Sequence, residues 1–173
     1  MHSTMLFPPK RHLTFATFES RPGSVHARSA CGQFAMRAGI AWQEPILILA
    51  GRPGAGKTHL LHATANLANE YDHIRSGITI SAQRLAEEVQ RATDFGDLSI
   101  WRDRFVGEDF LAVDDVDDLF DSSAGGDSYL LDVLRLRGDA NRRTLVSASL
   151  STALVSPCPL NTFLNHQRAV RLL

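Results

Sequence analysis

A short segment of the chain has the residue types and the spacing of a loop that binds phosphate groups. The pattern GxxxxGK[ST] is matched at every fixed position by Gly51-Arg52-Pro53-Gly54-Ala55-Gly56-Lys57-Thr58. Glycines in such a loop let the backbone adopt positive φ and approach phosphate oxygens without a Cβ clash. Backbone N–H groups and the positive end of the following helix then face the phosphates. The pattern therefore predicts a nucleotide site.

The side chains at the end of this loop have distinct expected roles. Lys57 would reach the β- and γ-phosphates as a catalytic group, and Thr58 would bind Mg²⁺. His59, the next residue, is also expected to bind the nucleotide. Lys10 and Lys57 are the only lysines among the 18 Lys and Arg residues. A lysine at position 57 therefore indicates that the loop needs a compact point charge rather than a planar guanidinium. A chance glycine-rich turn is the alternative interpretation.

A second candidate site element is a hydrophobic run that ends in two carboxylates, Phe110-Leu111-Ala112-Val113-Asp114-Asp115. Asp114 would hold Mg²⁺, directly or through water, and Asp115 would polarise the attacking water as the second catalytic residue. Carboxylates also end many strands that have no catalytic role. The phosphate loop upstream favours the catalytic interpretation.

Other polar residues are weaker candidates. Ser147 and Ser149 lie at the end of the predicted Leu145–Ala148 strand, where they would sense the γ-phosphate or simply form a turn. His59 and His62 are three residues apart on a helix and could share a metal, although a packed or exposed pair is the favoured interpretation. No third ligand accompanies the two histidines.

The charge is segregated along the chain. The net charge is −1, but residues 108–132 carry nine acids and no base. Within that stretch, Asp117, Asp118 and Asp121 are expected in a solvated loop. Arg142 and Arg143 are expected to cap a helix end, where a cation interacts favourably with the helix dipole. A nucleic-acid contact by these two arginines is the other possibility.

The elements that must position these residues alternate between strand and helix. Strands are predicted at Ile46–Ala50, Ile78–Ile80, Phe110–Val113, Leu145–Ala148 and Ala169–Leu172. Helices are predicted at Val25–Ala38 (between Ser24 and Gly39), Lys57–Glu70, after Ser81, at Leu98–Phe105 and at Ser128–Asn141. Such alternation implies a parallel sheet with helices on both faces. We therefore expect an α/β sandwich.

Length and composition agree with one globular domain. The 173 residues are 44% hydrophobic and 21% charged, which excludes collagenous, coiled-coil and wholly disordered chains. Cys31 and Cys158 belong to no metal or disulfide pattern, which indicates a reduced environment. The longest apolar run, Ile46–Ala50, is too short to span a bilayer. We expect a cytoplasmic protein with no membrane partner.

Four segments together resemble the AAA+ ATPases of the bacterial replication initiator family, DnaA and its homologue Hda. They are Leu13–Phe18, Gly51–Ala63, Thr79–Asp115 and Ala112–Val116. The resemblance implies a P-loop NTPase core over residues 13–173, a three-layer sandwich with a mainly parallel five-stranded sheet. It implies ATP or ADP with Mg²⁺ at the sheet edge and places Leu13–Phe18 near the adenine. Residues 1–12 would form a flexible arm.

Several features depart from the family pattern. The chain ends at Leu173, so we expect neither the helical lid with its arginine nor a DNA-binding domain. Phe163 occupies the position of the family's interface arginine, with Arg168 the nearest basic residue. Residues 121–127 contain no cation where initiators grip single-stranded DNA. The resemblance therefore implies weak or partner-dependent ATP hydrolysis, and weak or indirect DNA binding.

The implied role is initiation of chromosomal DNA replication or its regulation. The implied partner is a DnaA-type initiator or another AAA+ subunit, and the terminal Thr4–Pro8 segment suggests the sliding clamp, although it lacks the glutamine of clamp-binding peptides. A helicase-loader or transposition-accessory ATPase that binds single-stranded DNA is one alternative, and a non-hydrolysing nucleotide-dependent scaffold is another. A small-molecule kinase is disfavoured, because its catalytic arginines would have to come from the cluster at 135–143.

Overall fold

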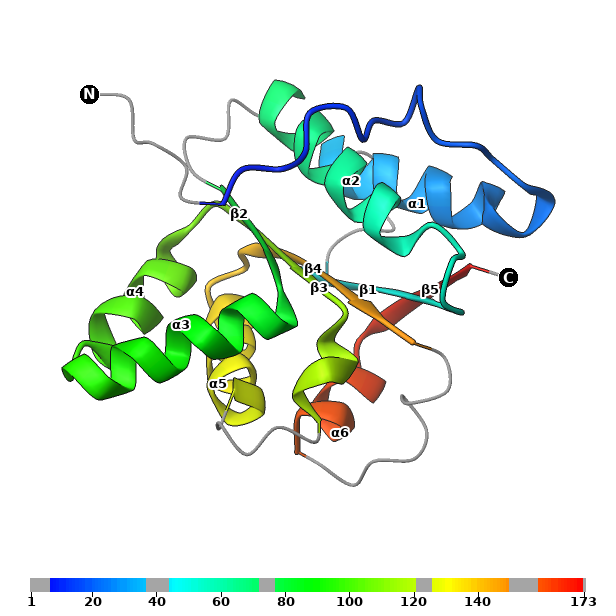
Figure 1. The fold of residues 1–173 in the computed structure, drawn as a ribbon. Coiled ribbons are helices and arrows are strands. Elements are labelled where there is room, and N and C mark those ends of the chain that lie inside the picture. Colours follow the sequence, from blue (N-terminus) through cyan, green and yellow to red (C-terminus); the bar gives the residue numbers. More distant parts are fainter. Residues whose placement is uncertain (1–6, 37–43, 72–76, 121–125, 150–158, 173) are drawn as a thin grey trace.

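The computed structural model describes residues 7–36, 44–71, 77–120, 126–149 and 159–172 (Figure 1). Five strands in this part form one sheet in the order β2-β3-β4-β1-β5, and every pairing is parallel. The strands are β1 (Ile46–Gly51), β2 (Gly77–Ser81), β3 (Phe110–Asp114), β4 (Arg143–Ala148) and β5 (Arg168–Leu172). The predicted parallel five-stranded α/β sandwich is confirmed.

Helices cover both faces of the sheet. They are α1 (Val25–Met36), α2 (Lys57–Tyr71), α3 (Ala82–Phe95), α4 (Leu98–Gly107), α5 (Gly126–Asp139) and α6 (Pro159–Asn165), with 3-10 turns η1 (Pro22–Ser24) and η2 (Val116–Leu119). Figure 1 shows α1 and α2 on one face and α3 to α6 on the other. None of the helices in the described ranges is both long and apolar enough to cross a membrane.

Strand β1 shows why the apolar runs form central strands. All six of its residues are buried, and successive side chains enter opposite cores, as the two-residue period of a strand requires. Ile46 and Ile48 face the core beneath α3 to α6, whereas Leu47 and Leu49 face the core beneath α1 and α2. A continuous apolar run is therefore the signature of a strand that is covered on both sides.

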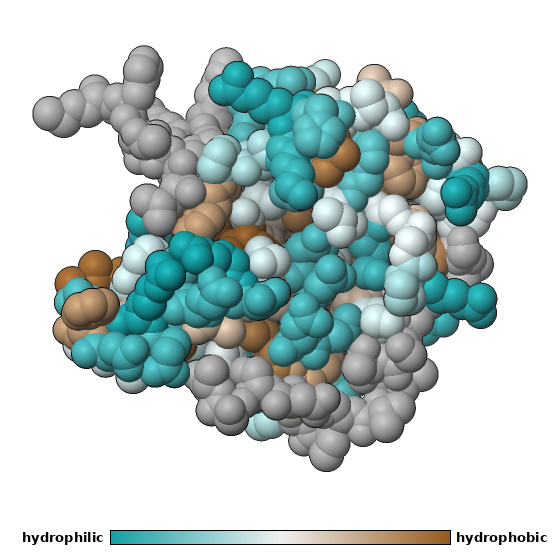
Figure 2. Space-filling model, viewed as in Figure 1, coloured by the Kyte–Doolittle hydropathy of each residue, from teal (hydrophilic) through white to brown (hydrophobic). Residues whose placement is uncertain are grey.

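Helix ends follow local chemistry that the sequence displays. Ser81 caps α3 by accepting a hydrogen bond from the Arg84 N–H at 3.3 Å, as predicted. Gly96 ends α3 with φ 76°, a left-handed conformation that favours glycine. On the face shown in Figure 2, hydrophilic side chains predominate over the exposed side of α3, where Arg84 pairs with Glu87 and Glu88.

Two helices differ most from the sequence expectation. Helix α5 begins at Gly126 and ends at Asp139, two residues earlier at each end than predicted. Helix α6 was not predicted, because its seven residues are too few to establish a helical period. The Gly39 helix stop, Asp121 and Cys158 lie outside the described residues.

Residues 7–12 of the predicted arm lie against the core. The Phe7 carbonyl accepts the Thr79 N–H of edge strand β2 at 2.8 Å. The Lys10 carbonyl accepts a hydrogen bond from the Asn66 side chain of α2 at 2.9 Å. Thr4, Met5 and Leu6 of the proposed clamp peptide lie outside the described residues, whereas Phe7 packs against the core beneath α3.

Arginines hold the amino-terminal edge of the sheet to its helices. Arg137 has no exposed surface, and its guanidinium donates to Thr144 Oγ1 (2.8 Å) and to the carbonyls of Phe105 (2.8 Å) and Glu108 (2.7 Å). Arg143 donates to the Ala35 carbonyl in the last turn of α1 at 2.6 Å. Arg142 likewise donates to the Gly107 carbonyl at the end of α4. Arg142 and Arg143 thus cap helix ends, as expected.

Replacing Arg137 with alanine is expected to destabilise the fold strongly. The substitution leaves several buried carbonyl groups without their donor, and each such group costs about 1–3 kcal/mol. We expect the free energy of unfolding to fall by about 3–5 kcal/mol in urea denaturation. Arg135→Ala, on the exposed side of the same helix, is the control and should change it by less than about 0.5 kcal/mol. Equal effects of the two substitutions would contradict this assignment.

Candidate nucleotide-binding site

The predicted phosphate loop connects the end of β1 to the start of α2. Gly54 and Gly56 have φ values of 77° and 96°, which L side chains rarely adopt. A Cβ at Gly56 would lie 2.8 Å from the Phe18 ring, so this position also lacks space for a side chain. The loop closes with a hydrogen bond of 3.1 Å from the Ala55 N–H to the Arg52 carbonyl.

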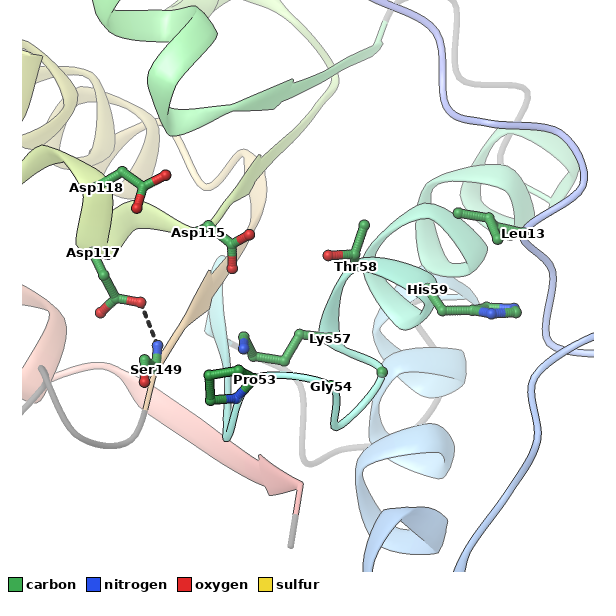
Figure 3. A pocket seen from close by; sticks show the side chains of 11 residues that line it. Leu13, Pro53, Gly54, Lys57, Thr58, His59, Asp115, Asp117, Asp118 and Ser149 are labelled. Carbon is green, nitrogen blue, oxygen red and sulfur yellow. Dashed lines mark hydrogen bonds between the residues drawn. The ribbon is translucent and has the colours of Figure 1, made fainter.

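Lys57 is the buried cation of the loop. Its side chain is 7% exposed, and Nζ donates to the carbonyls of Gly51 (3.1 Å) and Arg52 (3.4 Å). Figure 3 shows Lys57, Thr58 and Asp115 around one hollow, with the loop on one side and the end of β3 on the other. The fold therefore brings the two elements predicted from separate parts of the sequence to the same place.

The hollow is a cavity of about 660 Å³ at the carboxyl edge of the sheet. Its lining residues come from the phosphate loop, from the segment before α1, and from the ends of β3 and β4. They are Leu13, Pro53, Gly54, Gly56, Lys57, Thr58, His59, Asp115, Asp117, Asp118 and Ser149. Gly51, Arg52 and Ala55 belong to the loop but are not part of this wall.

Asp114 and Asp115 occupy different positions at the end of β3. Asp114 is 8% exposed and lines a neighbouring cavity of about 390 Å³ together with Thr58, so the two predicted Mg²⁺ ligands share a cavity wall. Asp115 faces the larger cavity. Burial, followed by the nearby Asp114 carboxylate, raises the pKa of Asp115, while the Lys57 ammonium opposes the shift.

The backbone of Asp115 is strained. Its φ of 53° and ψ of 55° lie in the left-handed region, which costs a residue other than glycine roughly 1–3 kcal/mol. The Asp115 N–H donates to Ser147 Oγ at 2.8 Å, and that hydroxyl also hydrogen-bonds to Asp114 Oδ1. The sequence did not reveal this connection, because Ser147 and the aspartates lie on different strands.

Asp117 and Asp118 lie in turn η2, where Asp118 is exposed, and both contribute to the cavity wall. The Asp117 carboxylate accepts the Ser149 N–H, which joins η2 to the end of β4 (Figure 3). Turn η2, which directly follows Asp115, brings both residues to this wall. Runs of acidic residues alone do not reveal such a turn.

The segment before α1 forms the opposite side of the site. His59 Nε2 lies 2.8 Å from the Thr14 carbonyl and 3.3 Å from Thr17 Oγ1. The Phe18 ring packs edge-on against His59, with ring centroids 5.2 Å apart. Residues 13–18 therefore adjoin the phosphate loop, and their place near the adenine stays a prediction.

The two histidines of α2 do not face each other. His62 Nδ1 accepts the Lys10 N–H at 3.2 Å, while His59 contacts residues 14–18. Desolvation lowers the pKa of His62, which favours the neutral form that this hydrogen bond requires. Among the described residues, no group of three or more His, Cys, Asp or Glu side chains is arranged to hold a metal.

Phe163 and Arg168, the two residues considered for the interface arginine, are not part of this cavity wall. Phe163, in α6, packs against the core beneath the sheet, and Arg168 begins β5. Within the part of the chain that the structure describes, the cavity wall contains no arginine.

Comparisons with known proteins identify the class to which this fold and site belong. The family described as the bacterial DnaA ATPase domain matches residues 10–165, most of the chain. The chain therefore belongs to the bacterial DnaA ATPase domain family, a group of AAA+ P-loop domains, as the sequence motifs indicated.

One relative is the chromosomal replication initiator protein DnaA of Bdellovibrio bacteriovorus. It is 39% identical over 107 residues, which cover 60% of this chain and 22% of that protein. The chain thus spans about a fifth of the length of this relative, which carries regions outside the match.

Solved structures show the same fold. Domain III of the Thermotoga maritima replication initiation protein DnaA has a TM-score of 0.85 at 21% identity, covering 96% of this chain and 69% of that chain. A DnaA structure bound to AMPPCP and single-stranded DNA has a TM-score of 0.80 at 18% identity, covering 94% and 50%. The DnaC helicase loader has a TM-score of 0.73 at 15% identity, covering 94% and 97%.

Gly56→Ala is expected to destabilise the loop. The alanine would require an unfavourable φ and a shift of the Phe18 ring, at a combined cost of roughly 1–3 kcal/mol in the free energy of unfolding. Gly32→Ala in α1 is the matched control, because no atom lies within 4 Å of the added Cβ. There the helix should gain about 0.5–1 kcal/mol. Chemical denaturation of both variants measures the change in the free energy of unfolding. An unchanged stability of Gly56→Ala would contradict the assignment of a crowded, positive-φ position to Gly56.

Proposed function

We propose that the chain binds an adenine nucleotide with Mg²⁺ and acts in the cytoplasm in the initiation of chromosomal replication or its regulation. The observation that carries this proposal is the placement of the Lys57 ammonium beneath the glycine loop, facing Asp115 across the cavity. Membership of the DnaA ATPase domain family supports it, as does the AMPPCP bound to a protein of the same fold.

The residues at the end of β3 and the start of α2 suit Mg²⁺. Hydroxyl and carboxylate oxygens are the ligands that this ion prefers, and Thr58 and Asp114 supply one of each to a shared cavity. Mg²⁺ usually keeps several waters beside one or two protein ligands and substrate phosphates, so a protein cage is not required. When bound, the ion would neutralise charge on the β- and γ-phosphates.

The remaining residues have roles that follow from their positions. Lys57 and the loop N–H groups would bind and orient the phosphates, because they face the cavity at the positive end of α2. Asp115 would orient the attacking water through the carboxylate that faces Lys57. Leu13 and His59 would contact the base or sugar at the other end of the cavity.

Hydrolysis by the chain alone should be slow. The described part of the wall supplies Lys57 but no arginine to stabilise the charge of the transition state. An arginine provided by another subunit is worth about 10³–10⁵ in rate in this class of enzyme. We therefore propose a DnaA-type initiator or another AAA+ subunit as the partner, with direct DNA binding secondary.

The helicase-loader alternative is compatible with the fold. The likeness to the DnaC loader covers nearly all of both chains, but at 15% identity it shows fold alone. The match to the DnaA ATPase domain family favours the initiator interpretation.

Removing the loop lysine should weaken nucleotide binding. Lys57→Ala deletes a charge-assisted contact worth about 1.5–3 kcal/mol, so the Kd for ATP with Mg²⁺ should rise roughly 10- to 100-fold in calorimetry. Arg135→Ala is the control, because Arg135 is exposed on α5 and lines neither cavity, so the affinity of this variant should stay unchanged. Equal binding by Lys57→Ala and the unaltered chain, or no binding by either, would overturn the nucleotide site.

ATP turnover by the isolated chain should be on the order of 10⁻³ s⁻¹ or slower, because the described residues of the wall include no arginine. Asp115→Asn should retain nucleotide affinity and lower this rate about a hundredfold, since the amide orients water poorly. Single-turnover measurements of phosphate release give the hydrolysis rate of the unaltered chain and of Asp115→Asn. A rate near 1 s⁻¹ without any partner would show that the chain supplies its own stabilising cation.

A further inference from the structure

Ser147 occupies a position where one hydroxyl can organise both carboxylates of the site. Ser147 is the second-to-last residue of β4 and has no exposed surface. The β3–β4 register pairs Val113 with Val146, so Ser147 lies beside Asp114 in the neighbouring strand. Its Oγ hydrogen-bonds to Asp114 Oδ1 and accepts the Asp115 N–H at 2.8 Å.

The chemistry of a hydroxyl fixes the direction of these two hydrogen bonds. A serine has one proton to donate and two lone pairs that accept. The Asp115 amide can only donate, and an ionised Asp114 carboxylate can only accept. Ser147 therefore commits its single proton to Asp114. A phosphate oxygen is an acceptor, so Ser147 has no proton left with which to sense it.

The two hydrogen bonds constrain different parts of the site. The bond to Oδ1 fixes the plane of the Asp114 carboxylate beside Thr58, and hydrogen bonds to a charged group are among the stronger ones. The bond from the Asp115 N–H holds a residue whose backbone is left-handed at φ 53°. That conformation turns the Asp115 side chain into the cavity, next to Lys57 (Figure 3).

We propose that Ser147 is a positioning residue that sets the Asp114 carboxylate toward the Mg²⁺ site and the Asp115 carboxylate toward the phosphates. It is not a phosphate sensor. The proposal rests on the proposed function, because it assigns Ser147 a role in the same nucleotide site. Hydrogen-bond partners of metal ligands commonly control metal affinity by orienting the ligand.

The test measures magnesium affinity rather than hydrolysis. A fluorescent ADP analogue is titrated with the unaltered chain and with Ser147→Ala, first in EDTA and then at increasing Mg²⁺. We expect Ser147→Ala to leave the Mg²⁺-free Kd within about twofold and to raise the Mg²⁺ concentration of half-maximal enhancement roughly 10- to 100-fold. An unchanged Mg²⁺ midpoint together with a weakened Mg²⁺-free affinity would overturn the proposal in favour of a phosphate contact.

A matched control separates positioning from general loss of packing. Thr144→Val removes another fully buried hydroxyl of β4, whose Oγ1 accepts from Arg137 at the opposite end of the strand. We expect this variant to lose stability in thermal denaturation while its Mg²⁺ midpoint stays unchanged. A shift of the midpoint equal to that of Ser147→Ala would show that weakened packing of β4, rather than positioning, causes the effect, and would overturn the proposal.

A second substitution covers the case in which Ser147→Ala does not fold. Ser147→Cys retains the shape of the side chain but offers only a weak donor, so it should give a smaller shift of the Mg²⁺ midpoint in the same direction. A wild-type midpoint in this variant would overturn the proposal. Absence of nucleotide binding by the unaltered chain is a different result, which would overturn the proposed function itself.

Discussion

Because β1, β4 and β3 lie side by side and run parallel, their carboxyl ends must meet at one edge of the sheet. The phosphate loop follows β1, two carboxylates lie at the end of β3, and Ser147 is the second-to-last residue of β4. Parallel strands cannot be joined by short turns, so each returns through a helix, and the loop after a strand lies where the next helix begins. The site is thus assembled from residues nearly a hundred positions apart by strand direction alone.

At the opposite edge of the sheet, hydrogen bonds from buried arginines to backbone carbonyls hold the strands to the helices. Arg137 and Arg143 bond to carbonyls of α4 and α1 with guanidinium groups that are almost entirely buried. These contacts fix the helices at the amino ends of the strands, at the opposite end from the Asp114 and Asp115 carboxylates. The functional edge is then free to hold strain, such as the left-handed backbone of Asp115, because the fold is secured elsewhere.

The sequence predicted the five strands and most helices because their apolar runs and caps are local signals. It also predicted which residues form the phosphate loop, since the pattern is contiguous. It could not predict that Ser147 contacts Asp114 and Asp115, because strand register decides which side chains become neighbours. The same limit explains Asp117, whose approach to Ser149 depends on a 3-10 turn with no distinct sequence pattern.

The charge of this edge favours a divalent cation beside the proposed nucleotide. Asp115, Asp117 and Asp118 line the cavity, and Lys57 is the only Lys or Arg among its described lining residues. Two like charges 4 Å apart repel by about 4 kcal/mol at an effective dielectric constant of 20. One ammonium and about half a charge from the α2 dipole do not offset three carboxylates facing a triphosphate. In the proposed function, Mg²⁺ would therefore strengthen nucleotide binding by neutralising the phosphates, and a hydroxyl that orients Asp114 would set the size of that effect.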